Sequence, residues 1–210
     1  SSRPSEGKST TALNLALVLA QAGQRVILVD ADLRRPQIHR LVEVQNRAGL
    51  TNLLLAEQGS ELKPLLQWTD VPSLEVLPTG PLPPNPADIL NLPRMQEIIT
   101  HLESIADMVL IDTPPMAFSD ALILSRYTDG ALLVVEAEKT RTKEVAETVQ
   151  SFEQSGKPII GTILNKVDFG RSGYRRYEYY RAYYDRDDDT PRIGADDLAP
   201  VSERRKPTWL

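Results

Sequence analysis

The 210-residue chain contains no cysteine, which excludes disulfides and thiolate metal sites. It also lacks any apolar run near the roughly 18–20 residues that a membrane-spanning helix needs. Acidic residues outnumber lysine and arginine by 29 to 24, and the formal charge of −5 gives no reason to expect general nucleic-acid binding. With 41% hydrophobic and 25% charged residues, the composition is that of a soluble domain with a sizeable core.

Aliphatic residues are nearly absent from the segment 172–189, which therefore cannot form a core of its own. Six of the chain's seven tyrosines fall in this segment, within eleven residues. We expect residues 171–210 to form a flexible tail and residues 1–170 to fold as one domain. The clustered tyrosines are Tyr174, Tyr177, Tyr179, Tyr180, Tyr183 and Tyr184.

A phosphate-binding signature, SEGKST, opens the chain. The full P-loop pattern is Gly, four residues, then Gly-Lys-Ser/Thr. Gly7, Lys8 and Ser9 match it, whereas Ser2 stands at the position of the first glycine. Backbone amides from Gly7 to Thr10 would cradle phosphate at a helix start, Lys8 would reach the β- and γ-phosphates, and Ser9 would bind Mg²⁺. The alternative is a chance tripeptide in a loop, which the long amphipathic helix and the strand that follow make a poor explanation.

Alternating strands and helices predict an α/β domain, in which a parallel sheet is flanked by helices. A P-loop normally follows a buried strand, yet this one starts at the first residue, so we expect the first, central strand to be missing. Apolar periodicity predicts strands at 25–30, 74–80, 107–115, 129–137 and 158–168, and helices at 11–23, near 36, within 50–59, at 87–105 with a break at Pro93, and at 142–155.

Three aspartates follow apolar runs at predicted strand ends. In VDADLRRP, alternation directs Asp30 and Asp32 to the same side, as two carboxylates near a metal or a proton-transfer site. Helix capping by Asp32 is the alternative. In LIDTPP, Asp112 has the Walker B position, where an acid holds Mg²⁺ directly or through water. Since open α/β sheets bind ligands at the carboxyl ends of strands, these acids and the phosphate loop together indicate a nucleotide site.

Two further motifs leave alternatives open. LNKVD at 164–168 is like the base-reading NKxD of GTPases, and Asn165 could equally contact adenine or simply end a strand. This motif does not choose between ATP and GTP. Asp120, in FSDA, follows the Walker B strand, and helix capping explains it as well as a functional role does.

Together, SEGKSTTALNLA, VILVDADLRRP, LPPNPADIL, VLIDTPP, SDALIL and the tyrosine-rich end resemble the bacterial tyrosine kinases (BY-kinases). These are the cytoplasmic kinase modules of capsular and exopolysaccharide co-polymerase systems. The resemblance covers about residues 1–184 and implies a MinD/ParA-like P-loop NTPase fold that uses ATP and Mg²⁺. The residues that it assigns are Gly7, Lys8, Ser9 and Thr10 in Walker A, Asp30 and Asp32 in Walker A′, Asp112 in Walker B, and the tyrosines at 174–184 as the autophosphorylated cluster. We also expect Glu6 and Asn165 among the nucleotide-binding residues.

The resemblance also implies partners and a location. Family members form a ring of subunits in which each tail enters a neighbour's site, and a membrane-spanning co-polymerase or activator switches them on. We therefore expect a homo-oligomer at the cytoplasmic face of a bacterial membrane, without a nucleic-acid partner. Two departures stand out: Ser5 replaces a glycine of many members, and the upstream subunit-contact segment is absent.

The expected reaction is ATP-dependent autophosphorylation of the tyrosine cluster. Tyrosine has a pKa of about 10, so an acid near the γ-phosphate should accept its proton. We expect Asp30 in this role, with Asp32 and Asp112 on the metal side. Two alternatives remain: a MinD/ParA-like ATPase that phosphorylates nothing, and a tail whose arginines and tyrosines stack on single-stranded nucleic acid.

Overall fold

The computed structural model describes residues 1–56 and 63–168. The chain divides into two units, Ser1–Val167 and Asp168–Leu210. The first unit is an α/β domain, as the sequence predicts. The flexible tail predicted for 171–210, with all six clustered tyrosines, lies outside the described residues.

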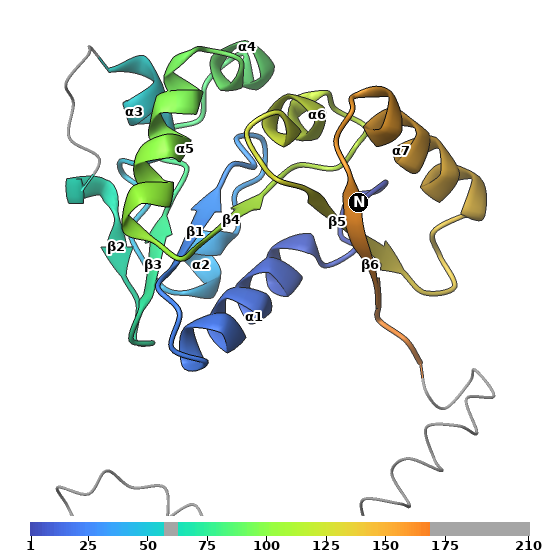
Figure 1. Ribbon diagram of the computed structural model, residues 1–210, viewed down its shortest axis with the longest axis horizontal. Helices are drawn as coiled ribbons and strands as arrows, with labels where there is room; N and C mark the ends of the chain where they lie inside the picture. Colours follow the sequence, from blue (N-terminus) through green and yellow to red (C-terminus); the bar gives the residue numbers. More distant parts are fainter. Residues whose placement is uncertain (57–62, 169–210) are drawn as a thin grey trace, which may run out of the picture. The chain divides into compact units, whose positions relative to one another are not determined.

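The strands form two sheets (Figure 1). The larger one has the order β2-β3-β1-β4, and the smaller one pairs β5 with β6. β1 is parallel to both of its neighbours, but β2 is antiparallel to β3. The sequence pattern did not predict β2, because two residues are too few to show alternation. The strands are β1 (Val26–Asp30), β2 (Gln67–Trp68), β3 (Leu74–Leu77), β4 (Met108–Asp112), β5 (Ala131–Glu136) and β6 (Ile159–Asn165).

The helices follow the predicted pattern, with one addition. Gly23, at φ 91°, follows the end of α1, and Pro93 separates α4 from α5. The short α6 was not predicted as a helix. The helices are α1 (Lys8–Gln21), α2 (Ile38–Leu41), α3 (Leu50–Leu55), α4 (Pro86–Leu90), α5 (Arg94–Ile105), α6 (Asp120–Ser125) and α7 (Thr142–Gln154), with a 3₁₀ turn at Lys63–Leu65.

β1 organises the core of the larger sheet because all five of its residues are buried. Its side chains alternate between the two faces, as a strand requires. Val26 and Leu28 pack with α1 and α2 on one face, while Ile27 and Val29 pack with α3, α4 and α5 on the other. An apolar run without polar alternation is the pattern of a strand covered on both faces.

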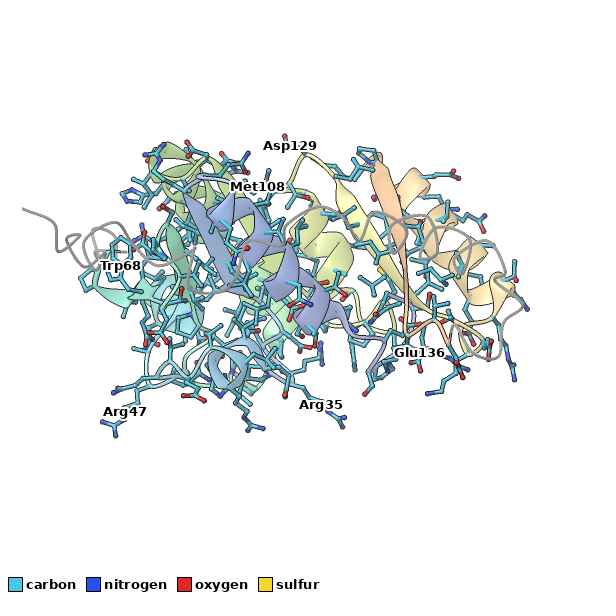
Figure 2. All side chains as sticks on the ribbon, turned by 90° about the horizontal axis from the view of Figure 1, so that it is seen from below. Arg35, Arg47, Trp68, Met108, Asp129 and Glu136 are labelled. Carbon is cyan, nitrogen blue, oxygen red and sulfur yellow. The ribbon has the colours of Figure 1, made fainter. Side chains whose placement is uncertain are left out.

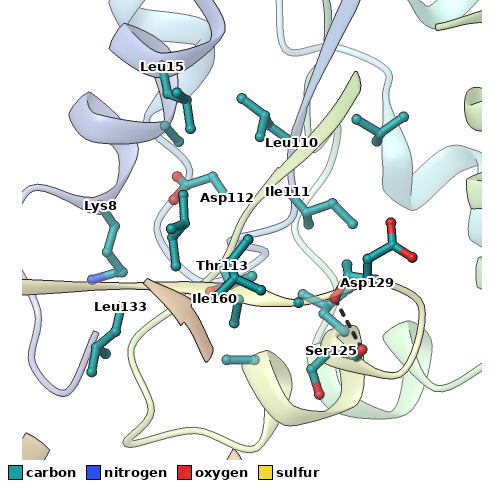
Figure 3. A pocket seen from close by; sticks show the side chains of 18 of the residues that line it. Lys8, Leu15, Leu110, Ile111, Asp112, Thr113, Ser125, Asp129, Leu133 and Ile160 are labelled. Atoms are coloured by element: carbon teal, nitrogen blue, oxygen red, sulfur yellow. Dashed lines mark hydrogen bonds between the residues drawn. The ribbon is translucent and has the colours of Figure 1, made fainter. Parts of the chain in front are cut away.

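A cavity of about 770 Å³ lies between the two sheets, lined by parts of β4, β5, β6 and α1. Within the part of the chain that the structure describes, β4 and β5 are each paired on one side only. Leu110, Leu133 and Ile160 are among the apolar residues around the space, and Lys8 and Asp112 stand at one end of it (Figure 3).

Candidate nucleotide site

The phosphate loop ends in a helix start that has unpaired amides. Gly7, at φ 93°, turns the chain into α1, and no side chain caps that helix. The first amides of a helix have no partner within it, and the helix dipole adds positive potential there. The amides of Lys8, Ser9 and Thr10 therefore offer a candidate anion site. Thr10 itself is exposed at the first turn.

Lys8 lies over the loop that precedes it. Its Nζ donates to Ser1 Oγ (2.9 Å) and to the Arg3 carbonyl (3.2 Å). Burial lowers the pKa of Lys8, and the nearby carboxylates of Asp112, Glu6 and Asp32 act in the opposite direction. The amine thus stands among the acids with hydrogen bonds that an incoming phosphate can replace.

Asp112 meets Asp30 across the β1–β4 ladder, where the two residues are register partners. Its carboxylate is buried, and Oδ2 has no hydrogen-bond partner. Burial, followed by the charge of Asp32, raises the pKa of Asp112 to about 6, against a hydrogen bond from Ser9 and the charge of Lys8. An unpaired buried oxygen beside a serine hydroxyl and a lysine is what a bound cation would satisfy.

Asp30 is enclosed by backbone amides. Oδ1 accepts from Asp32 N (3.3 Å), and Oδ2 accepts from Gln37 N (3.1 Å) and Ile38 N (3.0 Å). The side chain is fully buried. Burial, with the charge of Asp112, raises its pKa to about 7, although the hydrogen bonds from Ile38 and Asp32 oppose this. Asp30 therefore shapes the loop after β1, and its carboxyl can take up or release a proton near neutral pH.

Asp32 is slightly more accessible, at 8% exposure. Its Oδ1 accepts from Arg34 N (3.1 Å) and Arg35 N (2.9 Å), as a capping aspartate does. The charges of Asp32 and Asp112 act on each other and on Lys8. The structure therefore brings the three predicted acids and the lysine into one cluster.

An ion pair that the sequence did not predict supports this cluster. Arg34 donates from Nε (2.7 Å) and Nη2 (3.0 Å) to the carboxylate of Asp120, which is fully buried at the start of α6. The guanidinium also lies 4.0 Å from the ring centroid of Phe118. Asp120 thus ties the Walker A′ loop to the segment after Walker B. Only its position shortly after a strand-end aspartate had marked it in the sequence.

Asn165 lies against the phosphate loop. Its Nδ2 donates to the carbonyl of Glu6 (2.9 Å), and the buried carboxylate of Glu6 accepts from Arg3 N (3.0 Å) and from the hydroxyl of Thr140. A Cβ on Gly7 would lie only 2.1 Å from Asn165 Nδ2. The sequence marked Glu6 and Asn165 as nucleotide-binding residues but contained no signal for these contacts.

The side chains present fit Mg²⁺ together with phosphate. In the described part of the chain, no group of three or more His, Cys, Asp or Glu residues is placed to hold a metal ion. Mg²⁺ is usually bound by one or two carboxylates together with substrate phosphates and water. Ser9, Asp32 and Asp112 supply that small donor set, and the unpaired Oδ2 of Asp112 marks the position.

Within residues 1–56 and 63–168, no helix has the length and apolarity to cross a bilayer.

Comparisons with known proteins agree with this geometry. A family model described as "ParA: NUBPL iron-transfer P-loop NTPase" matches residues 1–178. Tyrosine-protein kinase YwqD of Bacillus subtilis is 39% identical over 178 residues, which are 84% of this chain and 73% of that protein. Tyrosine-protein kinase Wzc of Salmonella typhimurium is 36% identical over 88% of this chain, but the match spans only 26% of Wzc.

Solved structures give the same picture. The kinase domain of the Escherichia coli tyrosine kinase ETK has a TM-score of 0.74 and 38% identity, over 78% of this chain and 64% of that one. MinD of Pyrococcus horikoshii, solved with Mg-ADP, has a TM-score of 0.67 at 24% identity, over 82% and 69%, and supports the fold alone. The chain therefore belongs to the bacterial tyrosine-protein kinases, built on the P-loop NTPase fold of ParA and MinD.

Proposed function

We propose that this kinase transfers the γ-phosphoryl group of ATP to the tyrosines of its own C-terminal segment, 174–184. The observation that carries the proposal is the convergence of Lys8, Ser9 and the unpaired carboxylate oxygen of Asp112 at the uncapped start of α1. The same chain supplies a cluster of phenols after β6. A nucleotide site and a clustered acceptor on one polypeptide support self-phosphorylation.

Phosphoryl transfer depends mainly on positioning and charge neutralisation. In the proposed reaction the bond from the γ-phosphorus to the β,γ-bridging oxygen breaks and a bond to the tyrosine oxygen forms, leaving ADP. Lys8 and the amides of α1 hold the phosphates. Mg²⁺, held by Ser9, Asp32 and Asp112, would supply positive charge against the phosphate oxygens.

We propose Asp30 as the acceptor of the phenolic proton because its pKa of about 7 suits proton transfer near neutral pH. Asp32, which is more accessible, is the competing acceptor. A pH profile of the transfer rate separates them. If Asp30→Asn removes a limb near pH 7 that Asp32→Asn retains, Asp30 is the acceptor. The reverse result assigns the role to Asp32.

The central experiment is mass spectrometry of the protein after incubation with ATP and Mg²⁺. Phosphate is expected on residues 174–184 of the wild type and of Lys139→Ala, since Lys139 is an exposed lysine outside the site. It should be absent from Lys8→Ala. Phosphotyrosine that persists in Lys8→Ala would overturn the proposal. Release of labelled γ-phosphate only as free phosphate would instead favour a MinD/ParA-like ATPase.

We also propose a role in capsular or exopolysaccharide polymerisation and export, with a homo-oligomeric ring and a membrane-spanning activator at the cytoplasmic face of the membrane. The kinship with the tyrosine-protein kinase Wzc supports such a partner. Each phosphotyrosine adds about −1.5 to −2 charges, so heavy phosphorylation should drive tails apart and loosen a ring. Identical sizes of the phosphorylated and unphosphorylated full-length protein would contradict this step.

A further inference from the structure

The end of β6 contacts two consecutive carbonyls of the phosphate loop. Lys166 Nζ donates to the carbonyl of Ser5 (2.6 Å), and Asn165 Nδ2 donates to the carbonyl of Glu6 (2.9 Å). Ser5 has a φ of 62°, a left-handed conformation that is uncommon for serine. The lysine ammonium and the asparagine amide thus hold the two peptide units just before Gly7.

A third contact comes from the loop after β5. The hydroxyl of Thr140 donates to the buried carboxylate of Glu6 and accepts from the backbone N–H of Glu136 (3.1 Å). Burial acts to raise the pKa of Glu6, but hydrogen bonds from Thr140, Ser1 and the Arg3 amide reverse this and leave it lowered. Glu6 is therefore an anion that its hydrogen bonds hold within the phosphate loop.

Glu136 orients the lysine that holds Ser5. Its Oε2 lies 3.1 Å from Lys166 Nζ, and the same carboxylate pairs with Lys139. The Glu136 side chain is only 9% exposed, whereas that of Lys139 is 70% exposed. Figure 2 shows Glu136 at the end of the smaller sheet, where the chain of the phosphate loop passes. The two lysines share Glu136 as a partner, and Lys166 also donates to the carbonyl of Ser5 in the loop.

Space beside Gly7 is already filled by this arrangement. Gly7 has a φ of 93°, and a Cβ there would lie 2.1 Å from Asn165 Nδ2. The amide of Asn165 thus packs directly against the turn that starts α1. An amide in this position can support the loop without touching a nucleotide base.

We propose that Asn165, Lys166, Thr140 and Glu136 are positioning residues that hold the phosphate loop in its binding conformation, and that Asn165 acts through the loop and not by reading the base. A loop residue that is mobile before binding loses conformational entropy when the phosphate orders it, and this loss weakens binding. Preorganisation removes that cost from binding. The inference rests on the proposed function only in that the loop binds nucleotide phosphates.

The test is calorimetric binding of three probes in the presence of Mg²⁺: ATP, GTP and inorganic tripolyphosphate, which has no base. We expect similar effects from Asn165→Ala, Lys166→Met and Thr140→Val. Each should raise the Kd about tenfold for every probe that the wild type binds. Lys139→Met is the matched control, because it removes the other partner of Glu136, and its Kd values should stay within about twofold. Lys166→Arg, which keeps a cation of similar length, should recover most of the affinity.

Two outcomes would overturn the proposal. If Asn165→Ala weakens ATP but leaves tripolyphosphate unchanged, Asn165 contacts the base. If Lys166→Met binds all probes as Lys139→Met does, the lysine does not position the loop. Thermal melting of each variant separates unfolding from loop effects. At saturating ATP the variants should keep the wild-type kcat for tyrosine phosphorylation with a raised KM.

Binding without transfer distinguishes this inference from the proposed function. If the wild type binds all three probes but phosphorylates no tyrosine, the proposed autokinase activity is wrong. The effect of each variant on binding then still tests the positioning role. A wild type that binds none of them would overturn the assignment of the phosphate loop, and the positioning role with it.

Discussion

The two sheets of this domain are stabilised in different ways. In the larger one, β1 is buried along its whole length and paired on both sides. In the smaller one, β5 is the single partner of β6 among the described strands, and Ile160 and Leu164 are 67% and 52% exposed. What joins the smaller sheet to the nucleotide site is polar: Asn165, Lys166 and Thr140 all bond to the phosphate loop.

This difference shows how the phosphate loop is held from two sides. The larger sheet contributes Asp112, whose carboxylate meets Ser9 at the start of α1. The smaller sheet contributes hydrogen bonds to the backbone just before that helix. Apolar burial thus fixes where Asp30 and Asp112 lie, and hydrogen bonds fix the shape of the loop that faces them.

The largest expected change would merge the two sheets. Joining about five β-branched residues ahead of Ser1 should fill the cavity between β4 and β5 and raise the free energy of unfolding by on the order of 5 kcal/mol. Urea unfolding would measure this, and hydrogen exchange should show new protection of β4 and β5. A serine-glycine extension of equal length is the control, and equal stability of both extensions would rule out a strand in this space.

A leucine truncation in each sheet tests the contrast in burial. Leu28→Ala, at a fully buried position in β1, should cost about 2–5 kcal/mol through lost transfer energy and a cavity. Leu164→Ala in β6, which is 52% exposed, should cost less than about 1 kcal/mol. Urea unfolding followed by circular dichroism measures both. Similar losses at the two positions would contradict the difference that we describe.

A pH series tests the buried charge that the larger sheet contributes. Burial raises the pKa of Asp112 to about 6, so the folded state binds its proton more tightly than the unfolded state, whose pKa is about 3.9. The contribution of Asp112 to the free energy of unfolding is therefore complete below about pH 4 and is lost as the pH rises through about 6. Without metal or nucleotide, Asp112→Asn should therefore be stabilised by about 3 kcal/mol at pH 8, with loss of kinase activity.

The same gain should shrink steadily between pH 7 and pH 4, because the wild-type carboxyl then takes up its proton. Urea unfolding at pH 5, 6.5 and 8 measures the difference between the two proteins. Glu97→Gln, at an exposed position on α5, is the control for removing a carboxylate. A stability difference that stays constant across this range would show that the buried charge is not its source.

Two glycines with nearly the same backbone angle give the smallest expected effect. Gly23, at φ 91°, has open space at its Cβ position, so Gly23→Ala should cost about 1 kcal/mol for the left-handed conformation alone. Gly7, at φ 93°, has Asn165 in that position. Gly7→Ala should therefore cost more and also weaken ATP binding. Thermal melting and calorimetry check this, and equal effects at both glycines would mean that Asn165 moves aside freely.

Much of the fold was predictable because local patterns carry it. The apolar runs predicted β1 and β4 to within two or three residues, and their ends placed Asp30, Asp32 and Asp112 at one edge of the sheet. The two-residue β2 and the one-and-a-half-turn α6 were not predicted, because elements so short show no periodicity.

The sequence by itself determined the phosphate loop, the acid-ended strands and the family, since each is encoded by neighbouring residues of fixed chemistry. Only the tertiary structure decided which side chains meet. Glu6 and Thr140 lie 134 residues apart, and Asn165 lies 159 residues from the carbonyl that it bonds. Such contacts depend on the β5–β6 register and on the turn at Gly7, so no local pattern of residues specifies them.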